Sequence, residues 1–546
     1  MHRHGEAIYL ATHARLRPLD VRLNDTPRRA LKRNSTMLST FLFGFAVRFA
    51  QSLAQAAPFI LTGFFIAAVF RRFLGYEKTR QLFGGSEMAA LFKAWLIGML
   101  LPVCSLGVIP VIVELRRAGI KGGTILAFAM SAPLFNPLSL LYGLTLSEPI
   151  AILSFAGCSL VIVAVVGMVW DRVFPDSQMT GVADESVHHG IRRMVALGTS
   201  AGKSATGHSL MLVACGLIGV GLLGAIIPHA SLQHHFNHDQ PLAQLKMAAL
   251  GIPVYATPML AMSQMGMMFQ HANSIGAAFV LLTLGAGMNM GLVVWMIGQY
   301  GVKRSGVWMS LLLVVVIGLG YAVDKPLFPK DIDPANHTHA FDIYGQPFSG
   351  SGSFATLANQ SAEKLNRDIL PYEWYSLELL ALLMVAGIVV RLADRNGRLE
   401  TWVAQVPEPT ESGSMDIVVP PTVLGGLALV GLVIFSAVGC YSYYPPASEV
   451  FEEIHIAKGE ALSAGMSGDV THAEYWIDVY QEWTRKLEVG TFLRTGEVTD
   501  YQRWKARLVR EHLEMLKHSV QDGEHEEARA WVAKVQRSHN RMKDAF

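Results

Sequence analysis

The stretch Leu101-Pro-Val-Cys-Ser-Leu-Gly-Val-Ile-Pro110 decides the fold prediction, because it places two prolines inside one long apolar run. Proline removes a backbone donor and disrupts a helix at the preceding turn, and glycine lets the chain unwind. The next apolar run repeats the pattern in Ala127-Phe-Ala-Met-Ser-Ala-Pro-Leu-Phe-Asn-Pro137. At membrane depth, freed carbonyls and amides are tolerated only where protein or a water-filled cavity surrounds them. Two consecutive broken runs therefore favour a functional break over kinks that serve only packing, and paired broken helices are typical of transport sites.

These two runs belong to a longer series of apolar runs. A helix needs about 20 apolar residues to cross the hydrocarbon core of a membrane. Runs of that kind lie at 41–73, 90–115, 124–146, 149–170, 208–229, 246–269, 275–299, 305–323, 375–392 and 419–440. Because only helices satisfy their own backbone polar groups in lipid, the predicted fold class is all-α, a polytopic transmembrane helical bundle of about ten crossings.

The composition supports a membrane protein and argues against other classes. Hydrophobic residues make up 51% of the chain and charged residues only 16%, whereas about a quarter of an average soluble chain is charged. The formal net charge of +2 gives no indication of a nucleic-acid partner. We therefore expect a multi-pass protein of a cell membrane, the bacterial inner membrane, with the lipid bilayer as a partner.

The spacing of the cysteines and the lack of a phosphate-binding motif in the sequence argue against several further functions. Cys104, Cys158, Cys215 and Cys440 lie scattered in or beside apolar runs, with no CxxC pair. This spacing argues against a disulfide framework and against a structural zinc knuckle. No Walker A motif accompanies the spans, which disfavours ATP-driven pumping by this chain.

A weaker copy of the broken segments follows after roughly 150 residues. Gly251-Ile-Pro-Val-Tyr-Ala-Thr-Pro258 is similar to Leu101–Ser105, and the pair Ala278-Phe279 and the later Asn289 echo the second broken run. We therefore predict two degenerate four-helix repeats, 37–173 and 208–323, that contain broken helices. With four crossings in each half the copies would run parallel, unless a broken run is a re-entrant pair.

The motifs resemble those of a known family. Pro-Val-Cys-Ser-x-Gly-Val-Ile-Pro, then Leu-Arg-Arg-Ala-Gly, then Ala-Phe-x-x-Ser-x-Pro-x-x-Asn-Pro are similar to the predicted permeases of the ArsP/YraQ type, which include organoarsenical efflux permeases. The resemblance covers about residues 45–325 and implies an eight-span, two-repeat export permease driven without ATP. The family motif commonly reads Cys-Ser-Cys, whereas Leu106 stands at the second cysteine here. A site that needs two neighbouring thiolates for a trivalent arsenical would therefore lose one ligand.

The residues at the breaks form the predicted substrate pathway. A buried asparagine offers donors and acceptors where the helix ladder is interrupted. The set comprises Pro102, Cys104, Ser105, Pro110, Ser131, Pro133, Asn136, Pro137, Pro253, Tyr255, Thr257 and Asn289.

Soft ligands and a histidine-rich loop suggest metal binding. The Cys104 thiolate and the thioethers of Met259 and Met262 suit soft metals such as Cu(I). Alternatively, the methionines only fill gaps in a helical core. The imidazoles of His234, His235 and His238 are ordinary ligands for Zn(II) or Cu(II), although solvated loop histidines explain them equally well. A second loop carries His337-x-His339-x-x-Asp342. No cofactor is predicted.

The N-terminal segment 1–36 is basic and polar. It is either part of the protein or a gene-model extension, with Met37 as the true start. With this segment included, the distribution of Lys and Arg puts both chain ends in the cytoplasm, and without it the two orientations tie.

The second part of the chain differs in character from the permease core 37–323. The segment 324–374, rich in Asp, Pro, Gly, Ser and Asn, predicts an extended loop, and 375–440 predicts two further transmembrane helices. After Pro445-Pro446, apolar residues at helical spacing predict a soluble helical tail over 447–546, a small α-helical domain to which a protein partner could bind.

Two function classes follow. The first is a membrane permease, not an enzyme, that performs secondary efflux of a soft metal, metalloid or related small solute. The alternative is a non-transporting membrane scaffold or sensor that presents the C-terminal domain.

Overall fold

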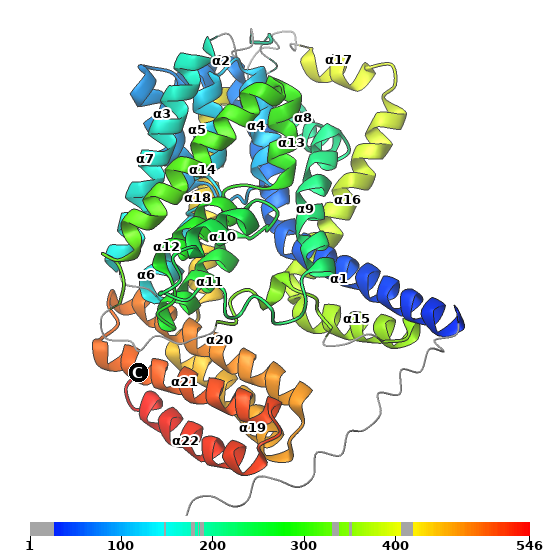
Figure 1. Cartoon of the computed structure of the whole chain (residues 1–546). Coiled ribbons are helices and arrows are strands. Elements are labelled where there is room, and N and C mark those ends of the chain that lie inside the picture. Colours follow the sequence, from blue (N-terminus) through cyan, green and yellow to red (C-terminus); the bar gives the residue numbers. More distant parts are fainter. Residues whose placement is uncertain are drawn as a thin grey trace, which may run out of the picture.

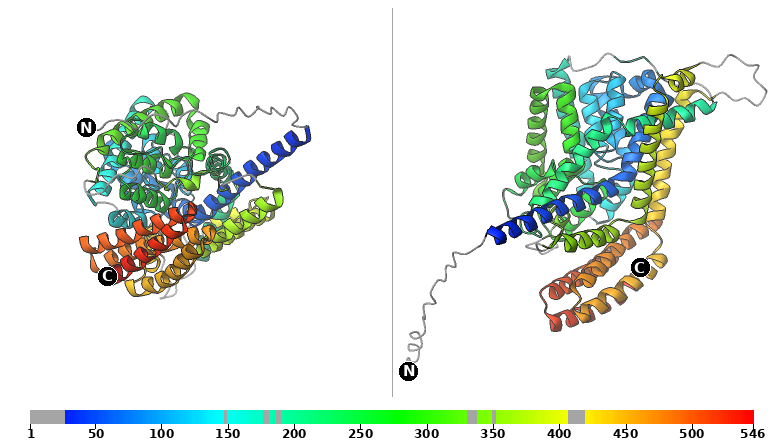
Figure 2. Two further views of the ribbon diagram at one scale, coloured as in Figure 1. Left: turned by 60° about the horizontal axis from the view of Figure 1, so that its bottom comes forward. Right: turned by 90° about the vertical axis from the view of Figure 1, so that its right-hand side faces the viewer.

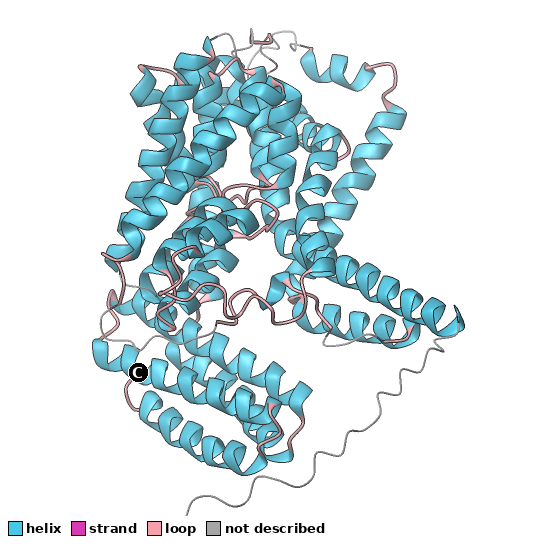
Figure 3. Ribbon diagram, in the orientation of Figure 1, coloured by secondary structure: helices cyan, strands magenta, loops and turns pink. Residues whose placement is uncertain are grey.

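The computed structural model describes residues 27–146, 149–175, 181–183, 185, 190–329, 338–348, 352–405 and 419–546. The described residues form helices and no β-strand, which confirms the all-α prediction (Figure 3). Residues 1–26 of the basic N-terminal segment and His337 lie outside the described residues.

The first half of the core contains one long helix followed by short and broken ones. It comprises α1 (Pro27–Val69), which continues through a π-helical turn (Phe70–Leu74) into α2 (Gly75–Phe83), then α3 (Glu87–Leu100), α4 (Val108–Arg117), α5 (Gly122–Ser131), α6 (Pro137–Leu146) and α7 (Pro149–Val173).

The second half has a similar order of helices. It comprises α8 (Gly190–Ala205), α9 (His208–Ile226), α10 (Ala243–Gly251), α11 (Pro258–Gln270), α12 (Ile275–Val280) with a π-helical turn (Leu281–Ala286), α13 (Met290–Tyr300) and α14 (Val302–Asp324).

The remainder holds two long apolar helices and a bundle. It comprises the 3-10 turn Asp342–Tyr344, α15 (Phe354–Asp368), α16 (Pro371–Ala393), α17 (Arg398–Ala404), α18 (Pro421–Tyr443), α19 (Ala447–Ser467), α20 (Val470–Thr495), α21 (Asp500–Gln521) and α22 (His525–Lys543).

Fewer helices cross the membrane than the apolar runs suggested. Among the described residues, six helices are long and apolar enough, or seven if the pair Ile275–Ala286 and Met290–Tyr300, bent by 60°, counts as one span. The expectation of about ten crossings is too high because the runs 90–115, 124–146 and 246–269 are each cut into two short helices. A run of apolar residues with a break in its middle can turn back instead of crossing.

The pair α3 and α4 is such a turn back. Glu87, at the start of α3, pairs with Arg172, near the end of α7, at 3.7 Å. Arg116, at the end of α4, donates to Gln299 Oε1 at 2.9 Å, and the neighbouring Tyr300 packs its ring against Trp170 of α7. The hairpin therefore enters and leaves at the end of the bundle where α7 ends.

The pair α10 and α11 turns back at the opposite end. Gln244, near the start of α10, hydrogen-bonds to Ser274 in the turn that follows α11. Ser274 Oγ in turn donates to Asp324 Oδ1, at the end of α14, at 2.9 Å. Because α14 starts next to the end of α7, it runs antiparallel to α7. Figure 1 accordingly shows α3 and α4 in the upper part of the core and α10 and α11 in the lower part.

The broken spans α5–α6 and α12–α13 run the full length of their neighbours. Gly123 N donates to Asp171 Oδ1 at the end of α7, while α6 ends just before α7 starts. In the second half, Gly276 N donates in the same way to Asp324 Oδ1 at the end of α14, and α13 ends just before α14 starts. Without the hairpins, each half consists of one unbroken helix, one broken span and one unbroken helix, although the helices of α5–α6 are too short to count among the candidate spans. Since three is odd, the halves run in opposite directions. The prediction of parallel copies excepted re-entrant pairs, and α3–α4 and α10–α11 are such pairs.

The segment 324–374 differs from the expected extended loop, because part of it forms α15. Its apolar residues lie on one face, where Leu357 is fully buried and Phe354 meets Phe43 of α1 edge to ring at 5.0 Å. The segment 338–348 is also fixed to the core: Arg48 of α1 donates to the carbonyls of Gly345 and Asp342.

The C-terminal helices α19–α22 form a bundle below the core (Figure 2). They enclose their own cluster of buried apolar side chains, including Ile477, Leu513 and Val535. The bundle also contacts the core: Tyr142 on α6 donates to Glu482 at 3.4 Å. A folded tail with a separate hydrophobic core therefore lies against one end of the membrane domain.

Candidate functional site

Three of the four breaks in the short helices are held by capping side chains. Asn136 Oδ1 accepts from Ser139 N at 2.7 Å, and Asn289 Oδ1 accepts from Leu292 N at 2.9 Å. Thr257 Oγ1 accepts from Leu260 N at 3.2 Å. These bonds satisfy backbone donors at helix starts that water cannot reach. Asn136 is 1% exposed and Asn289 is fully buried, so both asparagines face the interior and not the lipid.

Equivalent contacts recur in the two halves at a constant spacing. Asn136 and Asn289 are 153 residues apart. The hydrogen bonds Gly123 N to Asp171 and Gly276 N to Asp324 are both 2.7 Å long, and their donors and acceptors are also 153 residues apart. Each of these glycines lies against a carbonyl of the last helix of its half, where any side chain would overlap it.

A cavity of about 400 Å³ opens where three of the breaks meet. Pro102, Asn136 and Thr257, each from a different break, line it, together with Met259. Gln55 and Glu373 add polar groups to the wall. The remaining lining residues come from α1, α6, α11, α16 and α18: Pro58, Phe59, Thr62, Tyr142, Leu260, Ser263, Tyr372, Leu432, Phe435, Ser436, Gly439 and Tyr443.

A sulfur site lies deeper, between the break at 101–107 and the break at 252–257. Cys104 is fully buried and its Sγ accepts from Gly107 N at 3.4 Å. The Tyr255 hydroxyl, on the facing break, approaches this thiol. Leu106, two residues after Cys104, packs beside Gly216 of α9. A Cβ on Gly216 would also lie 2.9 Å from Asn289 Oδ1. The first break of one half thus abuts both breaks of the other.

Several buried polar atoms around this site have no hydrogen-bond partner among the described residues. They are Ser105 Oγ, Asn289 Nδ2 and Tyr255 Oη, whose approach to the Cys104 thiol lies outside hydrogen-bond geometry. An unsatisfied buried donor or acceptor costs about 1–3 kcal/mol, and native structures leave few of them. Three of them on facing breaks therefore mark a place where a polar solute or water could bind.

Other predicted residues have structural contacts instead. Ser131 Oγ lies 3.4 Å from the carbonyl oxygens of Ala94 and Phe128, Pro110 lies within α4, and Pro133 lies in the break that follows α5. Pro137 starts α6, and Pro253 packs against Gly219 of α9. Of the two methionines, Met259 lines the cavity, whereas Met262 packs against Gly143.

The metal role predicted for the loop histidines stays a prediction. His234, His235 and His238 belong to no group of three potential ligands among the described residues, and the His238 ring packs near Phe328. The group that does form is His339, Glu514 and His518. Sequence reasoning noted His339 but missed its partners, for which the only local signal is the four-residue spacing of Glu514 and His518 on one helix.

A second cavity of about 700 Å³ opens at the end of the bundle where α4 ends. Its wall carries more basic than acidic side chains. The charged residues are Arg71, Glu114, Arg116, Arg117, Lys203, Arg391, Asp394 and Arg395. Several of them are paired, as Arg117 is with Glu114 at 2.9 Å, yet the excess of positive charge favours anions in this cavity.

Comparison with known proteins decides the family. The ArsP_1 family model, described as predicted permease, matches residues 43–325, just over half of the chain. The chain belongs to this family. UPF0718 protein YcgR of Bacillus subtilis (strain 168) is 26% identical over 133 residues, which are 24% of this chain and 45% of the relative. The chain thus matches less than half of this relative's length. No solved structure matches.

Membership has direct consequences for this member of the ArsP_1 family. It is a multi-pass membrane protein of a family described as predicted permeases. A bacterial membrane is consistent with the relative from Bacillus subtilis. The helices α15–α22 lie outside the family match, although α16 and α18 contribute to the cavity wall.

Proposed function

We propose that the protein is a secondary permease that exports a soft metal, metalloid or related small solute through the interior where the four breaks meet. The observation that carries this proposal is the convergence of Pro102, Asn136 and Thr257 on one cavity. Irregular backbone at membrane depth is costly unless it lines a cavity or binding site, so three breaks around one cavity support a solute path.

We also propose that the two halves are inverted copies of one unit. The support is the opposite direction of the two hairpins and the constant spacing of the Asn, Gly and Asp contacts. In transporters, inverted halves can exchange conformations and so open a central site alternately to either side. The hairpin tips at Cys104 and Tyr255 would then be the moving parts nearest the solute.

The proposed solute class follows from the donors on the path. The Cys104 thiol and the Met259 thioether are soft ligands, and no second thiol lies beside Cys104 because Leu106 occupies that place. A single thiol with neighbouring hydroxyl and amide groups suits a solute that needs one soft ligand. The basic cavity near Arg116 and Arg117 favours a neutral or anionic metalloid species over a bare cation.

Two cysteine variants test the proposal in cells that lack their own exporters. We expect Cys104→Ala to abolish resistance to at least one of copper, zinc, cadmium and a trivalent arsenical at normal membrane levels. Cys158→Ala is the matched control, because Cys158 lies on α7 away from the breaks and lines neither described cavity. Unchanged resistance of Cys104→Ala to all four would contradict the proposal.

The scaffold or sensor function remains the second candidate, because the tail contacts the turn after α11: His271 Nε2 lies 2.9 Å from Glu514 Oε2. Purified protein in proteoliposomes separates the two functions. Movement of a solute from the same panel across the membrane supports the permease, whereas no movement of any of them, with a correctly folded protein, supports the scaffold.

A further inference from the structure

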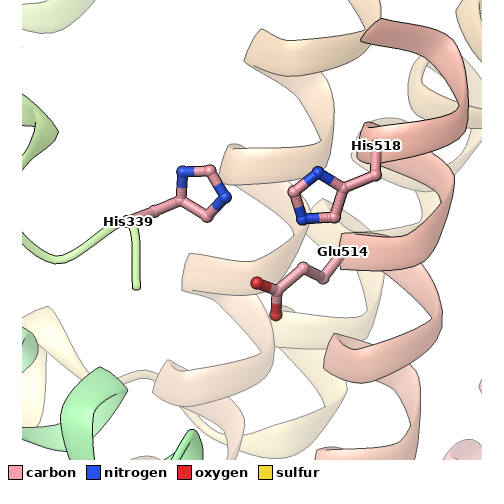
Figure 4. Close-up of side chains that lie close together, drawn as sticks. All are labelled: His339, Glu514 and His518. Atoms are coloured by element: carbon pink, nitrogen blue, oxygen red, sulfur yellow. The ribbon is translucent and has the colours of Figure 1, made fainter. Parts of the chain in front are cut away.

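Three potential metal ligands meet between the tail and the membrane core. His339 lies on the segment that follows α14, whereas Glu514 and His518 lie one turn apart on α21. Their ligand atoms all lie within 4.8 Å of one another. Figure 4 shows the two imidazole rings facing each other, with the carboxylate beside them.

Neighbouring groups hold two of these side chains in place. His339 Nδ1 lies 2.8 Å from Asp342 Oδ2, and Gln233 Nε2 donates to the same carboxylate at 3.0 Å. Glu514 Oε2 lies 2.9 Å from His271 Nε2. Histidines that bind metals commonly bond their other ring nitrogen to a carboxylate, which fixes the ring and its tautomer. The His339–Asp342 contact is of this kind and leaves Nε2 as the ligand atom.

We propose that His339, Glu514 and His518 bind one divalent transition-metal ion of the Zn²⁺ class, which fastens α21 of the tail to the membrane core. Two imidazole nitrogens and one carboxylate oxygen are a ligand set that zinc uses, with a fourth position for water. Bonds of about 2.1 Å place tetrahedral ligands about 3.4 Å apart. The ligand atoms therefore need to approach one another by at most about 1.4 Å when the ion binds.

The position of the site gives the ion a mechanical effect. The ion joins the tail to the segment 338–348, which Arg48 holds against α1. Glu514 also contacts His271, in the turn directly after α11, and the other end of α11 lines the cavity at Met259. Binding would therefore stiffen one re-entrant hairpin from outside the membrane. This inference does not depend on which solute the permease carries.

Binding can be measured on the purified full-length protein in detergent after treatment with a chelator. Co²⁺ serves as a spectroscopic probe and Zn²⁺ as its competitor. We expect one Co²⁺ per chain that Zn²⁺ displaces, and at least a roughly tenfold weaker affinity in His518→Ala and in Glu514→Gln, because each removes one of three ligands. The matched control is His472→Ala, whose ring pairs with Glu460 at 2.9 Å on the same tail without a third ligand, and which should bind as the wild type does.

Hydrogen–deuterium exchange tests whether the ion fastens the tail. We expect Zn²⁺ to slow exchange in α21 and in 338–348 of the wild type and of His472→Ala, and to have no such effect in His518→Ala. The proposal is overturned if the wild type binds neither Co²⁺ nor Zn²⁺ at about 100 μM, far above the dissociation constants of protein zinc sites. Binding that survives both ligand substitutions, for example at the histidines of 229–238, would overturn it as well.

Discussion

Replacing either of two equivalent glycines should destabilise the protein by a similar amount. Gly123 and Gly276 each start a broken span, donate a 2.7 Å hydrogen bond to an aspartate, and lie against the last helix of their half. A Cβ on Gly276 would lie 2.9 Å from the Gly320 carbonyl carbon, and one on Gly123 would lie 2.8 Å from Asp171 Oδ1. Carbon contacts prefer about 3.5–4.0 Å, so the helices must move apart.

The magnitude follows from the two interactions that alanine disturbs. Overpacking in a well-packed interior costs about 1–3 kcal/mol. Weakening a hydrogen bond to a charged group costs up to about 1.5–3 kcal/mol. We therefore expect Gly123→Ala and Gly276→Ala each to lower the free energy of unfolding by about 2–5 kcal/mol.

Matched controls lie on the same pair of partner helices. A Cβ on Gly157 of α7 or on Gly318 of α14 would meet no atom within 4 Å. Gly157→Ala and Gly318→Ala should therefore be neutral or up to about 1 kcal/mol more stable, because alanine favours helix. Unfolding by SDS in mixed micelles, followed by helix content, measures all four variants. If either Gly123→Ala or Gly276→Ala unfolds at the same SDS fraction as its control, the close packing inferred at these glycines is wrong.

Two further predictions concern the tail. Deleting residues from Ala447 onward should leave membrane insertion and export intact while removing any response to Zn²⁺. Membrane levels of the protein and transport in vesicles measure this. Lost export at normal membrane levels would show that the tail takes part in opening and closing the solute path. His539 contacts the Tyr480 hydroxyl at 2.7 Å, and its burial, together with Lys458, Lys543 and His455, lowers its pKa from 6.5 to about 4. His539 is therefore protonated below pH 6.5 in the unfolded tail but only below about pH 4 in the folded tail. As the pH falls from 6.5 to 4, the free energy of unfolding of the tail should decrease by roughly 1–2 kcal/mol, after allowance for solvent screening. Urea unfolding of the tail, followed by hydrogen exchange at pH 7 and pH 4.5, measures the loss, and a loss of the same size in His539→Gln would exclude His539 as its cause.

The positions of the breaks could be predicted from the sequence, but the path of the chain through them could not. Pro102 and Gly107 lie where the helix ends and restarts, because proline and glycine act locally. Whether the chain then crosses or turns back depends on distant contacts, such as Arg116 with Gln299. Apolar residues on both sides of a break satisfy either arrangement, which is why the number of crossings was overestimated.

The candidate site was predictable only where a local pattern carried the signal. Asn136, Thr257 and Met259 stand beside prolines at the breaks, and all three line the cavity. Gln55 and Glu373 also line it, yet nothing around them in sequence distinguishes them from other polar residues of membrane helices. The same holds for Glu514 and His518, whose approach to His339 depends on how the tail packs against the core.

The central claim is that a solute passes through the cavity where the breaks meet, and a pair of tryptophan substitutions on α18 tests it most directly. Gly439 lines the cavity and Gly431 does not, and a Cβ at either position meets nothing within 4 Å, so neither substitution forces a backbone clash. The solute is whichever of copper, zinc, cadmium and the trivalent arsenical the wild type exports. Its export rate is measured in vesicles that contain equal amounts of each variant. We predict that Gly439→Trp lowers the export rate at least about tenfold, a barrier increase of about 1.4 kcal/mol, while Gly431→Trp exports as the wild type does. Wild-type export by Gly439→Trp would contradict the claim.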